Sequence, residues 1–145
     1  MMDAHLVLDA SVVAKWFLHD EPETAAAFAL KDAWENERIE LHVPGGFHAE
    51  VCQLLAKACG TRDRVTRFPR MSAETAIECI AMLYSFPFTK SELTALRSTR
   101  ALALSTHWSK RFYDMTYLAL AEELDCRWIT ADDKILQGGA PTFPA

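Results

Sequence analysis

Residues 6–17 read LVLDASVVAKWF, and this stretch sets the expected fold. The segment His5–Asp9 is short and apolar with a preference for β structure, which predicts a buried strand. Helical periodicity follows from Ser11 to Leu18, so Asp9 stands where a strand passes into a helix. A carboxylate at such a position is either an ordinary helix cap or one wall of a charged active site.

The rest of the chain continues this alternation of strands and helices. Further strands are expected at residues 39–43 and 127–130, and Pro87 makes residues 85–88 a possible edge strand, because proline cannot donate to a ladder. Helices are expected at residues 22–37, which begin with Pro22, and at 47–59, 72–84 and 113–124, with a short last helix that ends at Leu136. A further helix is expected to run to residue 106, because Thr89 and Glu92 have the spacing of a capping box at its start. Strands separated by helices predict an α/β fold, a three-layer α/β/α sandwich with a short central parallel sheet. We expect a single domain over residues 1–145.

Composition narrows the class of protein. Half of the 145 residues are apolar and 24% are charged, which is typical of globular chains. No apolar run approaches the roughly 18–20 residues that cross a bilayer, and the first residues do not resemble a secretory signal. The four cysteines are widely spaced and form no CxxC pair, so we expect reduced thiols and a cytoplasmic protein.

Charge is distributed unevenly along the chain. A net charge of −5 argues against broad electrostatic attraction to nucleic acid. One segment is nevertheless basic, and it contains Lys57, Arg62, Arg64, Arg67 and Arg70 with Asp63 as the only acid. This basic segment either binds a polyanion locally or is a solvated loop between helices.

Four acidic residues are expected at one edge of the sheet. Asp9 ends the first strand, Asp132 follows the last, and Glu50 and Asp114 begin helices that are entered from the same edge. Each alone is explained as a helix-start residue that suits the helix dipole. Together, crowded carboxylates raise one another's pKa, and a divalent cation relieves that repulsion. Oxygen ligands favour Mg²⁺ or Mn²⁺ over zinc.

Three motifs carry a resemblance to a known family. VLDASVVAKWF at 7–17, PGGFHAEVCQLL at 44–55 and YDMTYLALAEELDCRWITADDKIL at 113–136 resemble, in order and spacing, the motifs of PIN-domain ribonucleases. The compact length is most similar to the VapC-type toxins of type II toxin–antitoxin pairs, and the resemblance covers about residues 3–136.

The resemblance implies an acidic catalytic quartet and a metal. It assigns catalysis to Asp9, Glu50, Asp114 and Asp132, with Asp9, Asp114 and Asp132 as ligands of Mg²⁺ or Mn²⁺. Ser11 and Thr130 are implied as polar supports. The family often has asparagine where this chain has Gln53, so the role of Gln53 stays open, and Asp133 is expected to be a helix cap. The implied function is a metal-dependent endoribonuclease toxin, with an RNA substrate, a VapB-type antitoxin and a homodimer as partners.

A metal held by carboxylates suits phosphodiester hydrolysis. It lowers the pKa of a bound water and neutralises phosphoryl oxygens. Such a reaction yields a 5′-phosphate and a 3′-hydroxyl and does not need the RNA 2′-hydroxyl. The candidate RNA contacts are Arg62, Arg64 and Arg67 in the basic segment, and Trp108, Lys110 and Arg111 in STHWSKRF. Core packing is the competing role for Trp108.

Other interpretations remain open at this stage. His48 and Cys52, with His42 and Cys59 nearby in sequence, permit a rival zinc site, although buried thiols explain the cysteines more simply. The chain is alternatively a catalytically inactive PIN-like module that binds a protein or RNA partner. A phosphoesterase for small phosphates is a third possibility, and the absence of GxxxxGK[ST] argues against nucleoside triphosphate chemistry.

Overall fold

The computed structural model describes residues 4–18, 24–60, 62 and 65–131. Within these residues the elements follow one another as β1 (Ala4–Leu8), α1 (Ala10–Phe17), α2 (Thr24–Glu35), β2 (Ile39–Pro44), α3 (Phe47–Gly60), α4 (Ala73–Ser85), β3 (Thr89–Ser91), α5 (Ala95–Trp108), α6 (Phe112–Leu124) and β4 (Arg127–Ile129). None of the helices in these ranges is long and apolar enough to cross a membrane.

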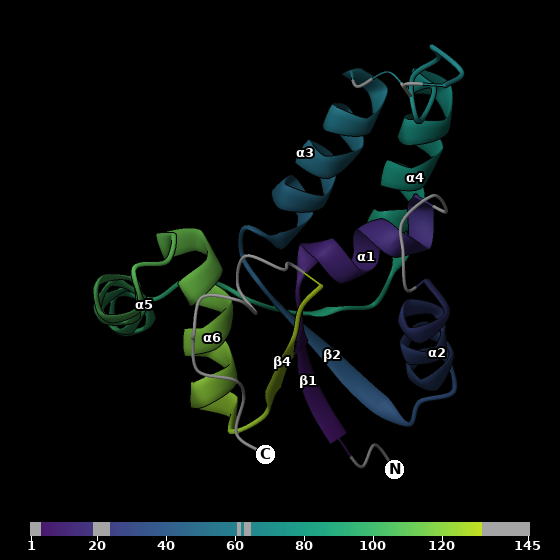
Figure 1. Cartoon of the computed structure of the whole chain (residues 1–145). Coiled ribbons are helices and arrows are strands. Elements are labelled where there is room, and N and C mark those ends of the chain that lie inside the picture. The colour runs from purple at the N-terminus through teal and green to yellow at the C-terminus, as the bar shows by residue number, and fades with distance from the viewer. Residues whose placement is uncertain (1–3, 19–23, 61, 63–64, 132–145) are drawn as a thin grey trace.

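The strands form a parallel sheet with helices on both faces. The four strands lie in the order β3-β2-β1-β4, and every neighbouring pair is parallel. Helix α6 packs on β1, β2 and β4 with α5 beside it, and α1 and α2 lie on the other side of the sheet (Figure 1). The predicted three-layer α/β/α fold is therefore confirmed. Helices α3 and α4 pack side by side and extend beyond the end of the sheet (Figure 1).

The sheet buries side chains on both faces. Val7 and Trp128 are register partners on β1 and β4, and the Trp128 ring stacks on Tyr117 of α6 with centroids 5.9 Å apart. Leu8 and Leu41 point to the opposite face, because side chains alternate along a strand. All five side chains are fully buried. A strand buried on both faces explains why residues 6–8 are continuously apolar.

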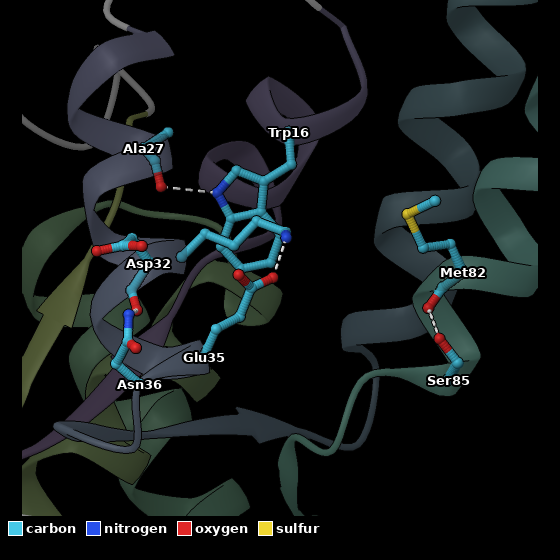
Figure 2. A network of polar contacts seen from close by, with 8 residues as sticks. Trp16, Ala27, Asp32, Glu35, Asn36, Met82 and Ser85 are labelled. Atoms are coloured by element: carbon cyan, nitrogen blue, oxygen red, sulfur yellow. Dashed lines mark hydrogen bonds and ion pairs between the residues drawn. The ribbon is translucent and has the colours of Figure 1, made fainter.

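A cluster of aromatic rings fills the space beside α1 and α2. Trp34 stacks on Phe88 with centroids 4.7 Å apart, and Trp16 stacks on both rings. The buried indole nitrogen of Trp16 donates a hydrogen bond of 2.8 Å to the carbonyl of Ala27 on α2 (Figure 2). This bond satisfies both groups inside the cluster and joins α1 to α2.

Two sequence predictions around β3 were wrong. The edge strand is Thr89–Ser91 rather than residues 85–88, because Phe86 and Phe88 pack their rings in the aromatic cluster. The predicted capping box at Thr89 and Glu92 therefore falls in and just after a strand. Helix α5 begins at Ala95, and its cap is Thr94, whose hydroxyl accepts from the amide of Arg97 at 3.1 Å. The expected helix start at Pro22 and the helix leading to Leu136 lie outside the described residues.

Replacing Trp16 with phenylalanine tests the joint between α1 and α2. Trp16→Phe keeps an aromatic ring but removes the indole donor that bonds Ala27, together with part of the buried ring volume. We expect the free energy of unfolding to fall by about 1–3 kcal/mol, measured by urea denaturation. Asn36→Ala is the matched control, because the Asn36 amide donates a bond of equal length, 2.8 Å, to Asp32 at an exposed site. Equal losses in the two variants would contradict a structural role for the buried bond.

Candidate active site

A pocket opens at the edge of the sheet where the parallel strands end. Its volume is about 610 Å³. Its walls come from the start of α1, the first turns of α3 and the start of α6. The lining residues are Asp9, Ala10, Ser11, Gly46, Ala49, Glu50, Gln53, Leu54, Arg111, Tyr113 and Asp114. Three of the four acids expected at this edge therefore share one pocket, and Asp132 lies outside the described residues.

Asp9 is both a helix cap and part of the pocket wall. Its backbone amide donates to the carbonyl of Ile129 on β4 at 2.9 Å, which fixes the residue against the neighbouring strand. Its Oδ2 accepts from the amide of Ser11 at 2.9 Å, as the cap of α1. The residue is only 6% exposed. The two interpretations of this aspartate from sequence are thus compatible, because capping α1 turns the carboxylate toward the pocket.

Glu50 has a strongly perturbed pKa. It lies in the first turn of α3, and its Oε2 accepts a hydrogen bond of 3.0 Å from the Tyr117 hydroxyl. Burial raises the pKa of Glu50 to about 7, and the charges of Asp9 and Asp114 add to this rise. The Tyr117 hydrogen bond and the positive charge of Arg111 lower the pKa but do not cancel the burial effect.

Ser11 and Thr130 meet beside the pocket. Their hydroxyl oxygens are 3.4 Å apart, and the amide of Ala131 donates to the Ser11 hydroxyl at 2.9 Å. Ser11 therefore holds the chain that leaves β4 against the start of α1. Thr130 is in contact with Ser11 but is not among the residues that line the pocket.

Three residues in or beside the pocket, Tyr117, Gln53 and Tyr113, carry no assigned role from sequence. Tyr117, which bonds Glu50, lies three residues after Asp114, and this spacing places both on one face of α6. Gln53 lies three residues after Glu50 and lines the pocket, as does Tyr113 next to Asp114. The spacing from a known acid was the available signal for Tyr117 and Gln53, but it did not reveal which partner each side chain meets.

The candidate RNA contacts divide into two groups. Arg111 lines the pocket, Lys110 precedes it, and Trp108 is partly buried against the core at the end of α5. Arg62 and Arg67 are exposed between α3 and α4, where the Arg62 side chain donates to the carbonyl of Arg67 at 2.9 Å.

Distance separates this second group from the pocket. Helix α3 carries the chain ten residues from Glu50 to Gly60, about 15 Å along its axis, before the basic segment begins. Arg62 and Arg67 are not among the pocket-lining residues. Arg64 lies outside the described residues.

The donor atoms of the pocket fit a hard divalent cation. Its metal-ligating side chains are carboxylates, whose oxygens are the ligands that such cations prefer. Burial is the largest cause of the raised pKa of Glu50, and the negative charges of Asp9 and Asp114, which a cation would offset, add to it. In the described part of the chain, Asp9, Glu50 and Asp114 do not form a set whose oxygens all lie within 4.8 Å of one another.

The rival zinc site is not assembled. His48 and Cys52 belong to no cluster of three ligands among the described residues, and all four cysteines are free.

Comparison with known proteins identifies the family. A profile of the PIN domain matches residues 6–139. The chain belongs to the PIN domain family. A comparison with curated proteins finds no match.

Solved structures of similar fold agree with this assignment. VapC20 of Mycobacterium tuberculosis, described as a sarcin–ricin loop cleaving toxin, is 18% identical with a TM-score of 0.64, covering 96% of this chain and 99% of its own. A toxin–antitoxin complex from Klebsiella pneumoniae contains a chain that is 16% identical with a TM-score of 0.60, and 92% of each chain is covered. VapBC2 from Rickettsia felis, bound to a promoter DNA fragment, contains a chain that is 10% identical with a TM-score of 0.62 and 97% of each chain covered.

The raised pKa of Glu50 predicts a pH dependence of stability. The folded protein binds the Glu50 proton with a pKa of about 7, above the ordinary value of 4.5, so it holds that proton more tightly than the unfolded chain does. The free energy of unfolding should therefore fall as the pH rises from about 4.5 to about 7, by up to about 3 kcal/mol from this group. Urea denaturation of metal-free protein across this range measures it.

Two variants separate Glu50 from other titrating groups. Glu50→Gln cannot ionise and should flatten the pH dependence. Tyr117→Phe removes the hydrogen bond that lowers the pKa of Glu50, so it should extend the fall to higher pH. If Glu50→Gln keeps the slope of the unchanged protein, the assignment of the titration to Glu50 is wrong.

Proposed function

We propose that this PIN-domain chain is a VapC-type toxin, a cytoplasmic endoribonuclease that hydrolyses RNA phosphodiester bonds with Mg²⁺ or Mn²⁺. The observation that carries the proposal is the meeting of Asp9, Glu50 and Asp114, from three separate elements, in one pocket. Several carboxylates in a partly buried pocket repel one another unless a cation is present. The family match and the VapC neighbours support the same activity. We take residues 1–145 as one functional domain.

The proposed metal ligands are Asp9, Asp114 and Asp132. A divalent cation held there would neutralise phosphoryl oxygens and lower the pKa of an attacking water. The amide of Ser11 donates to Oδ2 of Asp9 and holds this carboxylate at the pocket wall. Ser11 also fixes the chain just before Asp132 through the amide of Ala131.

Glu50 is the proposed proton acceptor. A pKa of about 7 is close to the working pH, which favours a general base. The Tyr117 hydroxyl occupies Oε2 of Glu50, so the Tyr117 hydrogen bond orients the carboxylate toward the pocket. Arg111 supplies a positive charge at the pocket wall that can bind a phosphate oxygen.

RNA is the proposed polyanionic substrate. Arg111 with Lys110 would bind phosphates near the scissile bond, and Trp108 is a further candidate contact from the same segment. Arg62, Arg64 and Arg67 would bind phosphates farther along the strand, because the basic segment lies at the far end of α3. Such contacts position RNA without reading its sequence.

A VapB-type antitoxin and a second copy of the chain are the proposed partners. The acidic pocket suits an antitoxin tail that inserts an Arg or Lys in place of the metal. Ile77, Met82 and Tyr84 of α4 expose more than half of their surface, and such side chains favour burial at an interface. Light scattering of the isolated chain should give twice the 16.3 kDa chain mass. A monomer mass at micromolar concentration would contradict the homodimer.

Substitution of the proposed ligands tests the activity. Asp9→Asn removes the charge while asparagine keeps the cap of α1, so the fold is retained. We expect Asp9→Asn and Asp114→Asn each to lower Mn²⁺-dependent cleavage of total bacterial RNA at least about 100-fold, because each loses a charged ligand worth several kcal/mol. Asp32→Asn, at an exposed acid paired with Arg38, is the control and should cleave normally.

Two outcomes would overturn the proposal. Cleavage that persists in both pocket variants would show that the active site is not this pocket. No cleavage by the unchanged chain, together with no heat of Mn²⁺ binding and tight capture of a partner, would establish the catalytically inactive binding module.

A further inference from the structure

Two histidines and a glutamate converge on one sheet face away from the acidic pocket. Nδ1 of His5 lies 3.0 Å from Nε2 of His42 and 3.0 Å from Oε2 of Glu40. Nε2 of His42 lies 3.7 Å from the same Glu40 oxygen. These atoms form the one set of three metal-ligating groups found within 4.8 Å of one another in the described part of the chain.

The strand register builds this cluster. His5 on β1 is the register partner of Glu40 on β2, and His42 follows Glu40 by two residues. Side chains two apart on a strand point to the same face, so the three groups are held by backbone pairing rather than by a loop. Ligands on paired strands are positioned more rigidly than ligands on loops.

A third strand orients the carboxylate. Thr89 of β3 is the register partner of His42, and its hydroxyl donates a hydrogen bond of 2.6 Å to Oε1 of Glu40. Oε1 is therefore occupied, while Oε2 faces the two imidazole rings. An outer hydrogen bond of this kind is what fixes ligating carboxylates in metal sites.

The separations are within about 0.4 Å of the edges of a tetrahedral zinc site. Zinc binds imidazole nitrogen and carboxylate oxygen at about 2.0–2.2 Å, so neighbouring ligand atoms of a tetrahedral ion stand about 3.3–3.5 Å apart. The observed separations of 3.0, 3.0 and 3.7 Å lie on both sides of that value. Two imidazoles with one carboxylate is a ligand set that zinc uses, with water at the fourth position.

We propose that His5, Glu40 and His42 bind a Zn²⁺ ion at a site distinct from the acidic pocket. The two sites lie toward opposite ends of β1, because His5 is four residues from Asp9, about 13 Å along the strand. Their ligands also differ, since a nitrogen-containing set selects zinc whereas carboxylates alone suit Mg²⁺ or Mn²⁺. Zinc at this site would join β1 to β2 and stabilise the folded chain by binding it preferentially.

Histidine NMR tests the site directly. The untagged full chain is stripped with chelator, because a polyhistidine tag would bind the same metal. Zn²⁺ is then titrated while the ring-nitrogen signals of the five histidines are followed. We expect the signals of His5 and His42 to shift with one equivalent of Zn²⁺ and the signal of His107, on α5, to remain unchanged.

Variants assign the effect to the ligands. The His5 side chain is 53% exposed, so His5→Gln should fold normally, which circular dichroism checks, and should bind Zn²⁺ at least about tenfold more weakly. Thr89→Val should weaken binding by about 10–100-fold through the orientation of Glu40. His107→Gln is the matched control and should bind as the unchanged chain does.

The same titration separates this site from the acidic pocket. The double variant Asp9→Asn with Asp114→Asn should retain the Zn²⁺ shifts of His5 and His42, whether or not the chain is a nuclease. The proposal is overturned if Zn²⁺ leaves both ring signals in place. It is equally overturned if His5→Gln binds Zn²⁺ as tightly as the unchanged chain.

Discussion

The hydrogen bond from the Ser11 amide to the Asp9 carboxylate joins the fold to its chemistry. Parallel pairing of β1 with β4 fixes the backbone of Asp9 through the carbonyl of Ile129, and the cap then sets the direction of the side chain. A nearly buried carboxylate is thereby held at the edge of the sheet where α3 and α6 also begin. The acidic pocket follows from this geometry, because all three elements start at the same edge.

Burial of carboxyl groups close to one another is the main energetic feature of that pocket. Glu50 keeps its proton to a pKa of about 7 because burial and two neighbouring aspartates oppose its ionisation, and Tyr117 only partly compensates. The metal-free fold thus carries an electrostatic penalty where a cation would bind. The cluster of His5, Glu40 and His42 is different, since two of its three members are imidazoles and its one carboxylate accepts a hydrogen bond from Thr89.

The sequence predicted the layers of the fold and the edge at which the acids gather. This succeeded because the apolar strand segments and the positions of Asp9, Glu50 and Asp114 beside strand or helix ends are local features. Long-range packing was not predictable in the same way. From sequence, Phe86 and Phe88 are typical strand residues. In the structure their rings pack against Trp16 and Trp34, and the edge strand is Thr89–Ser91.

The pairing register of the strands also could not be predicted from the sequence. The sequence shows His5, Glu40 and His42 but does not show which residue of β1 faces which residue of β2, and a shift of one residue would send one set of side chains to the opposite face. The contact between Tyr117 and Glu50 likewise joins residues 67 apart in the chain. Only the assembled sheet and helices bring these groups together.

The chemical ends of the cleaved RNA test the central claim most directly. A carboxylate-held metal that activates water should leave a 5′-phosphate and a 3′-hydroxyl, and should still cut a substrate whose cleaved nucleotide lacks the 2′-hydroxyl. The account predicts both results in Mn²⁺, by end-labelling of the products. Products with a 5′-hydroxyl and a 2′,3′-cyclic phosphate, and no cutting of the 2′-deoxy substrate, would contradict it.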